Sequence, residues 1–162
     1  MFKNNIIFVI PGGGGKTTLS KQHDDFIDID DYWNIKEEVE SKMIKEFNEA
    51  QENNNTDLIQ KLIKDCMNYK ALKLKNSQIK QNSIILVQSI EQANIITDDK
   101  NNIFCFVPDK DFHEMIMDKR KDSNFVKEVC RMQRKDIFDS GWNYKCYNSF
   151  KELDILIDEI IK

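Results

Sequence analysis

Residues 5–18 read Asn-Ile-Ile-Phe-Val-Ile-Pro-Gly-Gly-Gly-Gly-Lys-Thr-Thr, an unbroken apolar run followed by four glycines, a lysine and two threonines. An apolar run without polar alternation is typical of a strand buried on both faces, as in a parallel sheet. Consecutive glycines let backbone N–H groups turn inward around phosphate oxygens, and a lysine adds positive charge for the same oxygens. The pattern predicts a phosphate-binding loop made by Gly12, Gly13, Gly14, Gly15, Lys16, Thr17 and Thr18.

The loop chemistry favours a nucleotide phosphate with Mg²⁺ as the ligand, because the Thr17 hydroxyl is suited to bind Mg²⁺ beside phosphate oxygens. A helix that starts at Thr17 adds the positive end of its dipole. The full pattern G-x-x-x-x-G-K-[ST] would place its first glycine at position 10, where this chain has Ile10. Gly12–Gly14 supply flexibility nearby, and whether Ile10 weakens ATP binding stays open at this point.

Beyond the loop, apolar runs alternate with helical patterns. The strands are expected at residues 5–10, 26–30, 83–89, 103–107 and 144–147, and the helices at 17–22, 33–51, from an N-cap at Thr56, at 111–121, at 125–138 and after a Ser149-x-x-Glu152 capping box. Strand–helix alternation with right-handed crossovers predicts an α/β fold, a doubly wound five-stranded parallel sheet flanked by helices. We expect one domain over residues 1–162, with a helical insertion at about 33–80 and a helical lid at about 110–139.

Length and composition exclude several classes of protein. A chain of 162 residues has no room for a second full domain, and its net charge of −4 argues against a stable duplex nucleic-acid partner. No apolar run reaches transmembrane length, and residues 1–5 do not resemble a signal peptide, so we expect a cytoplasmic protein without a membrane partner. The four cysteines lie far apart without Cys-x-x-Cys spacing, which argues against zinc. The oligomeric state is unknown from the sequence.

Acidic residues end the second expected strand, in the order Asp28-Ile29-Asp30-Asp31-Tyr32-Trp33. Alternation along a strand places Asp28 and Asp30 on one face. Ligands of open α/β sheets bind at the carboxyl ends of strands, so these carboxylates are candidates to accept a hydroxyl proton or to hold a metal-bound water.

The strand, the Gly-Lys-Thr loop, the short helix and the acidic strand end together resemble the P-loop kinase superfamily, including polynucleotide 5′-hydroxyl, shikimate-type and small nucleoside or nucleotide kinases. The resemblance covers residues 5–33 and implies the kinase type of P-loop NTPase fold. It implies that Asp30 is the general base toward an acceptor hydroxyl, with Asp28 beside it at the substrate and metal. The spacing from Lys16 to Asp30 is shorter than in these relatives, so the helix behind the loop should have only about two turns.

The resemblance also implies a lid whose arginines close on the transferred phosphoryl group, which points to Arg120. All three arginines of this lysine-rich chain lie within 15 residues, so Arg131 and Arg134 join Arg120 as candidate ATP ligands. A solvated helix face, or a salt bridge from Arg131 to Glu128, would explain them equally. By position, Asn148 lies where these relatives receive adenine.

Further candidates for the acceptor side carry structural alternatives. Tyr32 and Trp33 follow the acidic residues and are suited to stack a base or to pack in the core. Gln88, at a strand end, is a candidate substrate ligand or only a polar terminus. Residues 61–80 hold six lysines and one acid, either a guide for a phosphorylated acceptor or a charged surface.

Taken together, the residues predict an ATP-dependent phosphotransferase acting on a hydroxyl or phosphate of a nucleoside, a nucleotide or a nucleic-acid 5′ end. Lys16, Asp30 and Arg120 are its expected catalytic groups. The apolar run at 84–87 ends in Gln88-Ser89 instead of an acid, which argues against GTPases, motor ATPases and helicases. Position 10 is not glycine, and no acid follows the apolar run at 84–87. These two departures leave one alternative, a nucleotide-binding regulatory or structural module without efficient catalysis.

Overall fold

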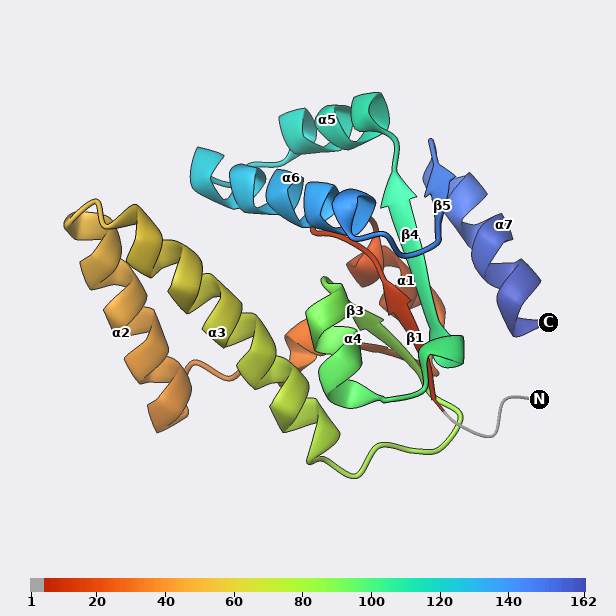
Figure 1. Cartoon of the computed structure of the whole chain (residues 1–162), viewed down its shortest axis with the longest axis horizontal. Coiled ribbons are helices and arrows are strands. Elements are labelled where there is room, and N and C mark those ends of the chain that lie inside the picture. Colours follow the sequence, from red (N-terminus) through yellow and green to blue (C-terminus); the bar gives the residue numbers. More distant parts are fainter. Residues whose placement is uncertain (1–4) are drawn as a thin grey trace.

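The computed structural model describes residues 5–162, and a sheet of five parallel strands forms its centre (Figure 1). The strands follow the order β2-β3-β1-β4-β5 across the sheet, and each neighbouring pair is parallel. They are β1 (Ile6–Val9), β2 (Phe26–Asp28), β3 (Ile84–Val87), β4 (Ile103–Pro108) and β5 (Tyr144–Tyr147). The predicted α/β class with five parallel strands is confirmed.

Helices connect the strands and flank the sheet. They are α1 (Lys16–Gln22), α2 (Glu38–Glu52), α3 (Thr56–Lys75), α4 (Ile90–Ile96), α5 (Lys110–Lys119), α6 (Asn124–Asp139) and α7 (Phe150–Ile161), with two short 3-10 segments, η1 (Ile29–Tyr32) and η2 (Lys100–Asn102). Helix α1 has seven residues, which confirms the predicted two turns. None of the helices in residues 5–162 has both the length and the apolar character that a membrane span requires.

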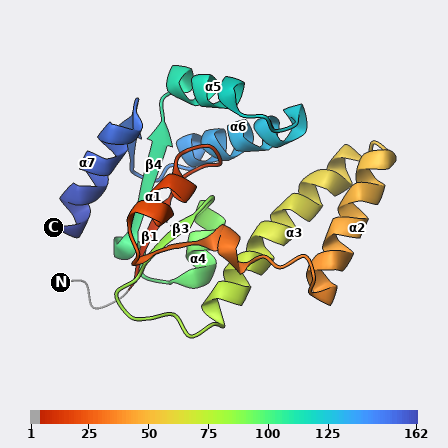
Figure 2. The same cartoon turned by 180° about the vertical axis from the view of Figure 1, so that it is seen from behind.

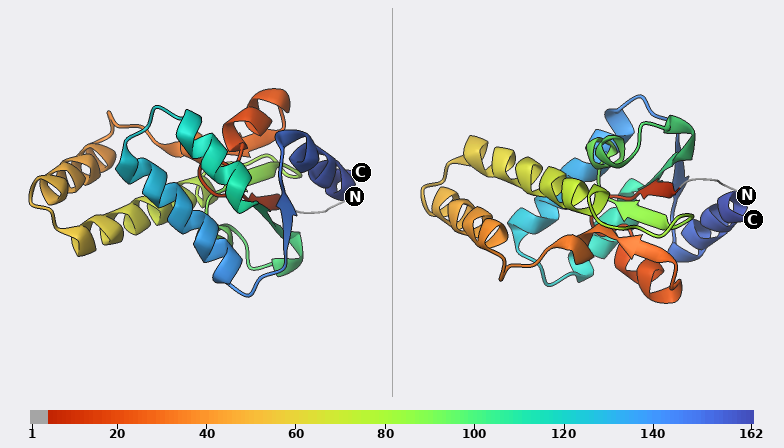
Figure 3. Two further views of the ribbon diagram at one scale, coloured as in Figure 1. Left: turned by 90° about the horizontal axis from the view of Figure 1, so that it is seen from above. Right: turned by 90° about the horizontal axis from the view of Figure 1, so that it is seen from below.

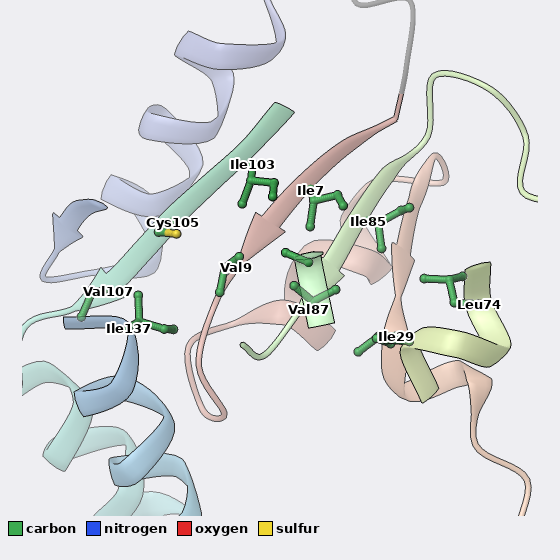
Figure 4. Packing of buried hydrophobic residues seen from close by; sticks show 12 residues of the cluster. Ile7, Val9, Ile29, Leu74, Ile85, Val87, Ile103, Cys105, Val107 and Ile137 are labelled. Atoms are coloured by element: carbon green, nitrogen blue, oxygen red, sulfur yellow. The ribbon is translucent and has the colours of Figure 1, made fainter. Parts of the chain in front are cut away.

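Both faces of the sheet are covered, because successive residues of β1 point to opposite sides. Ile7 and Val9 pack with side chains of α3, α4 and α6 on one face (Figure 4). Ile6 and Phe8 pack with α1 and α7 on the other. All four residues of β1 are buried, as its apolar run predicts, and burying one such side chain contributes about 1.5–3 kcal/mol.

Three local boundaries differ from the expected ones. Strand β2 ends at Asp28, because the Asp28 carboxylate accepts the Asp30 N–H and turns the chain into η1. The expected shared strand face of Asp28 and Asp30 is therefore wrong. Helix α2 begins at Glu38 instead of 33, and the side chain that caps α3 is Asn55 instead of Thr56.

Helices α2 and α3 form a hairpin that projects away from the sheet, as views from behind and from above and below show (Figures 2 and 3). Helix α3 packs on α4 and η1, and α2 packs on α3. Near the tip, the Phe47 ring of α2 lies 5.5 Å from the Phe125 ring of α6. The hairpin and α6 thus face each other beyond the carboxyl ends of β1 and β3.

Candidate functional site

A cavity of about 530 Å³ lies between the glycine loop after β1, the η1 segment, the hairpin and α6. Strand β1 sits between β3 and β4, and the chain crosses over it on the way from β3 to β4. Ligands of open parallel sheets bind where the strand order reverses in this way. The polar side chains and glycines that line the cavity are Gly12, Gly13, Gly15, Lys16, Thr17, Thr18, Asp30, Lys70, Gln88, Arg120 and Gln133.

Backbone angles and hydrogen bonds within the chain define the conformation of the glycine loop. Gly13 and Gly15 have φ angles of 75° and 106°, in the left-handed region that favours glycine. The Gly14 N–H donates to the Pro11 carbonyl at 2.9 Å, closing a turn. Ile10 is buried below this turn, and a Cβ on Gly14 would lie 2.5 Å from its Cγ2. Ile10 therefore supports the turn from the core side and does not enter the cavity.

Three side chains hold the loop from other elements. Tyr147 Oη of β5 donates to the Gly14 carbonyl at 2.7 Å. Gln133 Oε1 of α6 accepts the Gly12 N–H at 2.8 Å. His113 Nε2 of α5 lies 2.9 Å from the Gly12 carbonyl, which can only accept, so Nε2 carries the hydrogen. Burial lowers the pKa of His113, consistent with a neutral ring.

Tyr147→Phe is expected to destabilise the fold by roughly 1–2 kcal/mol, because it leaves the buried Gly14 carbonyl without its partner. Urea denaturation measures the change. Tyr144→Phe, on the same strand with an exposed side chain, is the matched control and should change stability little. Equal effects of the two substitutions would contradict an anchoring role for Tyr147.

Lys16 is the residue of the loop with the least ordinary environment. It is only 5% exposed and lines the cavity, and within residues 5–162 no hydrogen bond or ion pair engages its ammonium. Burial lowers its pKa, while the nearby charges of Asp30 and Asp28 oppose that shift. A desolvated cation without a partner binds an anion strongly, since the cost of burying it is then offset.

Asp30 also lines the cavity, and two side chains fix its carboxylate. Lys70 Nζ of α3 lies 2.7 Å from Oδ1, and Gln88 Nε2 after β3 donates to Oδ2 at 3.0 Å. Each carboxylate oxygen has two lone-pair sites, so each keeps room for one more hydrogen bond. The side chain is oriented but still able to accept.

Asp28 lies deeper than Asp30 and does not line the cavity. It is 3% exposed, and burial raises its pKa despite the opposing charge of Lys16. The structure therefore does not place Asp28 in the lining of the cavity, where its expected role would put it. Its carboxylate turns the chain at η1, which positions Asp30.

Asp28→Asn is expected to gain stability relative to the wild type as the pH rises above the ordinary aspartate pKa of 3.8, so its advantage is larger at pH 8 than at pH 4. A buried acid with a raised pKa binds more protons in the folded than in the unfolded state, so wild-type stability falls as the pH rises through that range. Asparagine keeps the acceptor for Asp30 N–H and removes this dependence. Urea denaturation at both pH values is the measurement, and exposed Asp25→Asn is the control. A wild type that becomes more stable than Asp28→Asn toward pH 8 would contradict this prediction.

Several predicted ligands lie elsewhere. Arg131 is held by Glu114, with Nε 2.9 Å from Oε1, and also pairs with Glu128 at 3.4 Å. Arg134 Nε donates to the Pro108 carbonyl at 2.8 Å. Neither guanidinium lines the cavity, so the clustering of arginines reflects structural contacts at these two positions. Arg120 does line it and pairs with Asp122.

The remaining candidates divide between the cavity and the core. Gln88 lines the cavity. Tyr32 packs against the core on one face of the sheet, and the Asn148 N–H donates to Glu152 at 2.7 Å, so the structure brings neither to the cavity. Gly14 supports the loop without lining the cavity.

Lys70 and Gln133 are site residues that sequence reasoning missed. Lys70 belongs to the lysine-rich segment 61–80, and nothing in that segment distinguishes it from its neighbours. Gln133 lies between two arginines and matches no motif. Both reach the site through tertiary packing of α3 and α6, which no local pattern specifies.

The residues present fit a magnesium polyphosphate. The exposed side chains of Thr17 and Thr18 border the cavity beside the unpartnered Lys16, and the first N–H groups of α1 lack intrahelical partners. No group of three or more His, Cys, Asp or Glu side chains in the described part of the chain is arranged to hold a metal ion. Thr17 is therefore the side chain suited to Mg²⁺, with the phosphates and water completing its shell.

Neither a protein-family model nor a curated protein matches this sequence.

Proposed function

We propose that this chain is a cytoplasmic ATP-dependent phosphotransferase of the P-loop kinase type, which transfers the γ-phosphoryl group to a small acceptor. One observation carries the proposal: the nearly buried Lys16, whose ammonium has no partner, and the oriented carboxylate of Asp30 line the same cavity. Phosphoryl transfer needs these two elements, a fixed positive charge for the phosphates and a group that positions the nucleophile.

The residues divide the work between two sides of the cavity. Lys16, the loop amides and Thr17 hold the polyphosphate and Mg²⁺. Arg120, which lines the cavity, exchanges its partner Asp122 for the transferred phosphoryl group. Bound ATP supplies the phosphoryl group: the acceptor oxygen gains a bond to the γ-phosphorus, the bond to the β,γ-bridging oxygen breaks, and ADP leaves. Asp30 orients the acceptor hydroxyl and takes its proton, which then passes to water.

Transfer from γ-labelled ATP tests the proposal. Pools of nucleosides, nucleoside monophosphates, 5′-hydroxyl oligonucleotides and small polyols serve as acceptors, and label should appear in one pool. Lys16→Ala is the blank, and Lys21→Ala, exposed on the same helix, is the matched control. Absence of Lys16-dependent label in every pool would contradict a phosphotransferase.

A nucleotide-binding module without catalysis is the second candidate, and one observation favours it. Two of the cavity's polar groups already have protein partners, since the Gly12 N–H donates to Gln133 and both oxygens of Asp30 accept hydrogen bonds. Calorimetric binding of ATP without ADP formation in the presence of any acceptor pool would favour the module over the enzyme.

A further inference from the structure

The side of the cavity away from the glycine loop is apolar. We call this side the hairpin wall; it comprises Met43, Ile44 and Phe47 of α2, Leu62, Ile63, Cys66 and Met67 of α3, and Phe125, Val126 and Val129 of α6. These side chains come from the projecting hairpin and from α6, whose ribbons can be followed in Figure 2. A molecule that reaches Asp30 from this side therefore contacts mostly hydrocarbon and sulfur.

The cations near the hairpin wall are already neutralised. Lys70 pairs with Asp30, and Arg120 pairs with Asp122. The other lysines of α3 that face acids are Lys61 with Asp65, Lys64 with Glu91, and Lys73 with Glu37 and Glu40. Four of the six lysines of segment 61–80 are thus paired, and the other two, Lys75 and Lys80, do not line the cavity.

Helix α2 adds negative charge to the same side. Its residues 38–52 contain five glutamates and two lysines. Three of these glutamates pair with lysines, Glu46 with Lys42, Glu49 with Lys45 and Glu40 with Lys73, and none of the five lines the cavity. Helix α2 therefore offers no unpaired lysine to a phosphate on the acceptor.

A ring next to Asp30 gives the apolar side its shape. Trp33 lines the cavity, Lys70 Nζ lies 5.5 Å from the centre of its ring, and the Tyr69 ring meets it edge-on at 6.3 Å. The indole is therefore fixed in orientation by two α3 side chains. A fixed aromatic surface binds a flat apolar group at little entropic cost.

We propose that the acceptor is a small uncharged alcohol with a flat aromatic ring, of the nucleoside type, and carries no phosphate of its own. This inference rests on the proposed function and names its substrate class. The ring lies against the hairpin wall and Trp33, and the hydroxyl reaches Asp30. The acceptor oxygen then bonds to the γ-phosphorus as its proton goes to Asp30, and ADP leaves with the β,γ-bridging oxygen.

Binding is tested without turnover by the fluorescence of Trp33. The chain has two tryptophans, so Trp142→Phe leaves Trp33 as the reporter. Nucleosides and phenyl-substituted alcohols should shift its emission at concentrations at least about tenfold lower than the matching monophosphates. Stronger shifts with monophosphates or oligonucleotides, or no shift with any compound, would overturn the inference.

A charge placed in the wall tests the same point by activity. Ile44→Lys should raise KM for the uncharged acceptor about tenfold or more, because an ammonium replaces apolar surface against the ring. Val39→Lys, on the same helix but 50% exposed and outside the cavity, adds the same charge and should leave KM unchanged. Equal KM in the two variants would overturn the inference.

The outcomes separate this inference from the proposed function. Lys16-dependent transfer to monophosphates or oligonucleotides, with none to uncharged alcohols, overturns the acceptor class and leaves the phosphotransferase standing. If neither ATP binding nor transfer depends on Lys16, both the acceptor class and the proposed phosphotransferase function are overturned.

Discussion

Lys16→Ala is expected to lower phosphoryl transfer by about 100- to 1,000-fold, the usual cost of removing one preorganised group that stabilises transition-state charge. The ammonium is nearly buried and no other group in residues 5–162 pairs with it, so no protein contact competes with the phosphates for it. Weaker ATP binding should accompany the loss of rate, measured by titration calorimetry together with transfer from γ-labelled ATP.

The fold should survive this substitution. Burial lowers the pKa of Lys16, so its charge disfavours folding and its removal relieves that cost. Circular dichroism and a thermal unfolding curve check this, with exposed Lys21→Ala as the control for loss of a lysine on the same helix. A folded Lys16→Ala protein with wild-type transfer would remove the basis of the proposed mechanism.

Asp30→Asn should lower transfer to a hydroxyl acceptor by about 100- to 10,000-fold, the range attributed to general acid–base catalysis. Asparagine has nearly the same size and keeps an oxygen for Lys70, but its amide cannot take the acceptor proton. ATP binding should change little, because Asp30 contacts the acceptor side of the cavity. Rates at saturating ATP, with calorimetry of ATP alone, separate the two effects.

Exposed Asp31→Asn is the matched control for this experiment, since it removes the neighbouring charge outside the cavity. A phosphate acceptor needs no base, so full transfer by Asp30→Asn would indicate phosphate as the acceptor group. That result would contradict both the role of Asp30 and the uncharged acceptor inferred from the hairpin wall.

Features set by neighbouring residues could be predicted from the sequence. The burial of Ile6–Val9 follows from an apolar run of strand length, and the two turns of α1 follow from the short distance between Lys16 and Asp30. The Ser149 cap of α7 follows from its spacing to Glu152, and its side chain accepts the Glu152 N–H at 3.2 Å. Each of these three features depends on residues that lie close together in the sequence.

Features set by tertiary contacts could not be predicted. The sequence near Arg131 does not reveal that Glu114, 17 residues away on another helix, takes its guanidinium. The partners of Asp30 likewise come from α3 and from the end of β3. The early end of β2 had a local signal, because aspartate side chains often hydrogen-bond the N–H two residues ahead and compete with strand pairing.

The three side chains that hydrogen-bond to the glycine loop affect how tightly the loop binds an anion. Tyr147, Gln133 and His113 come from β5, α6 and α5, so elements that follow the loop by about 100 residues or more set its curvature. A loop that already has its binding conformation loses little conformational entropy when an anion binds. A larger share of the free energy of the contacts then contributes to affinity. Residues in the second half of the chain therefore determine the conformation of the phosphate-binding loop near its start.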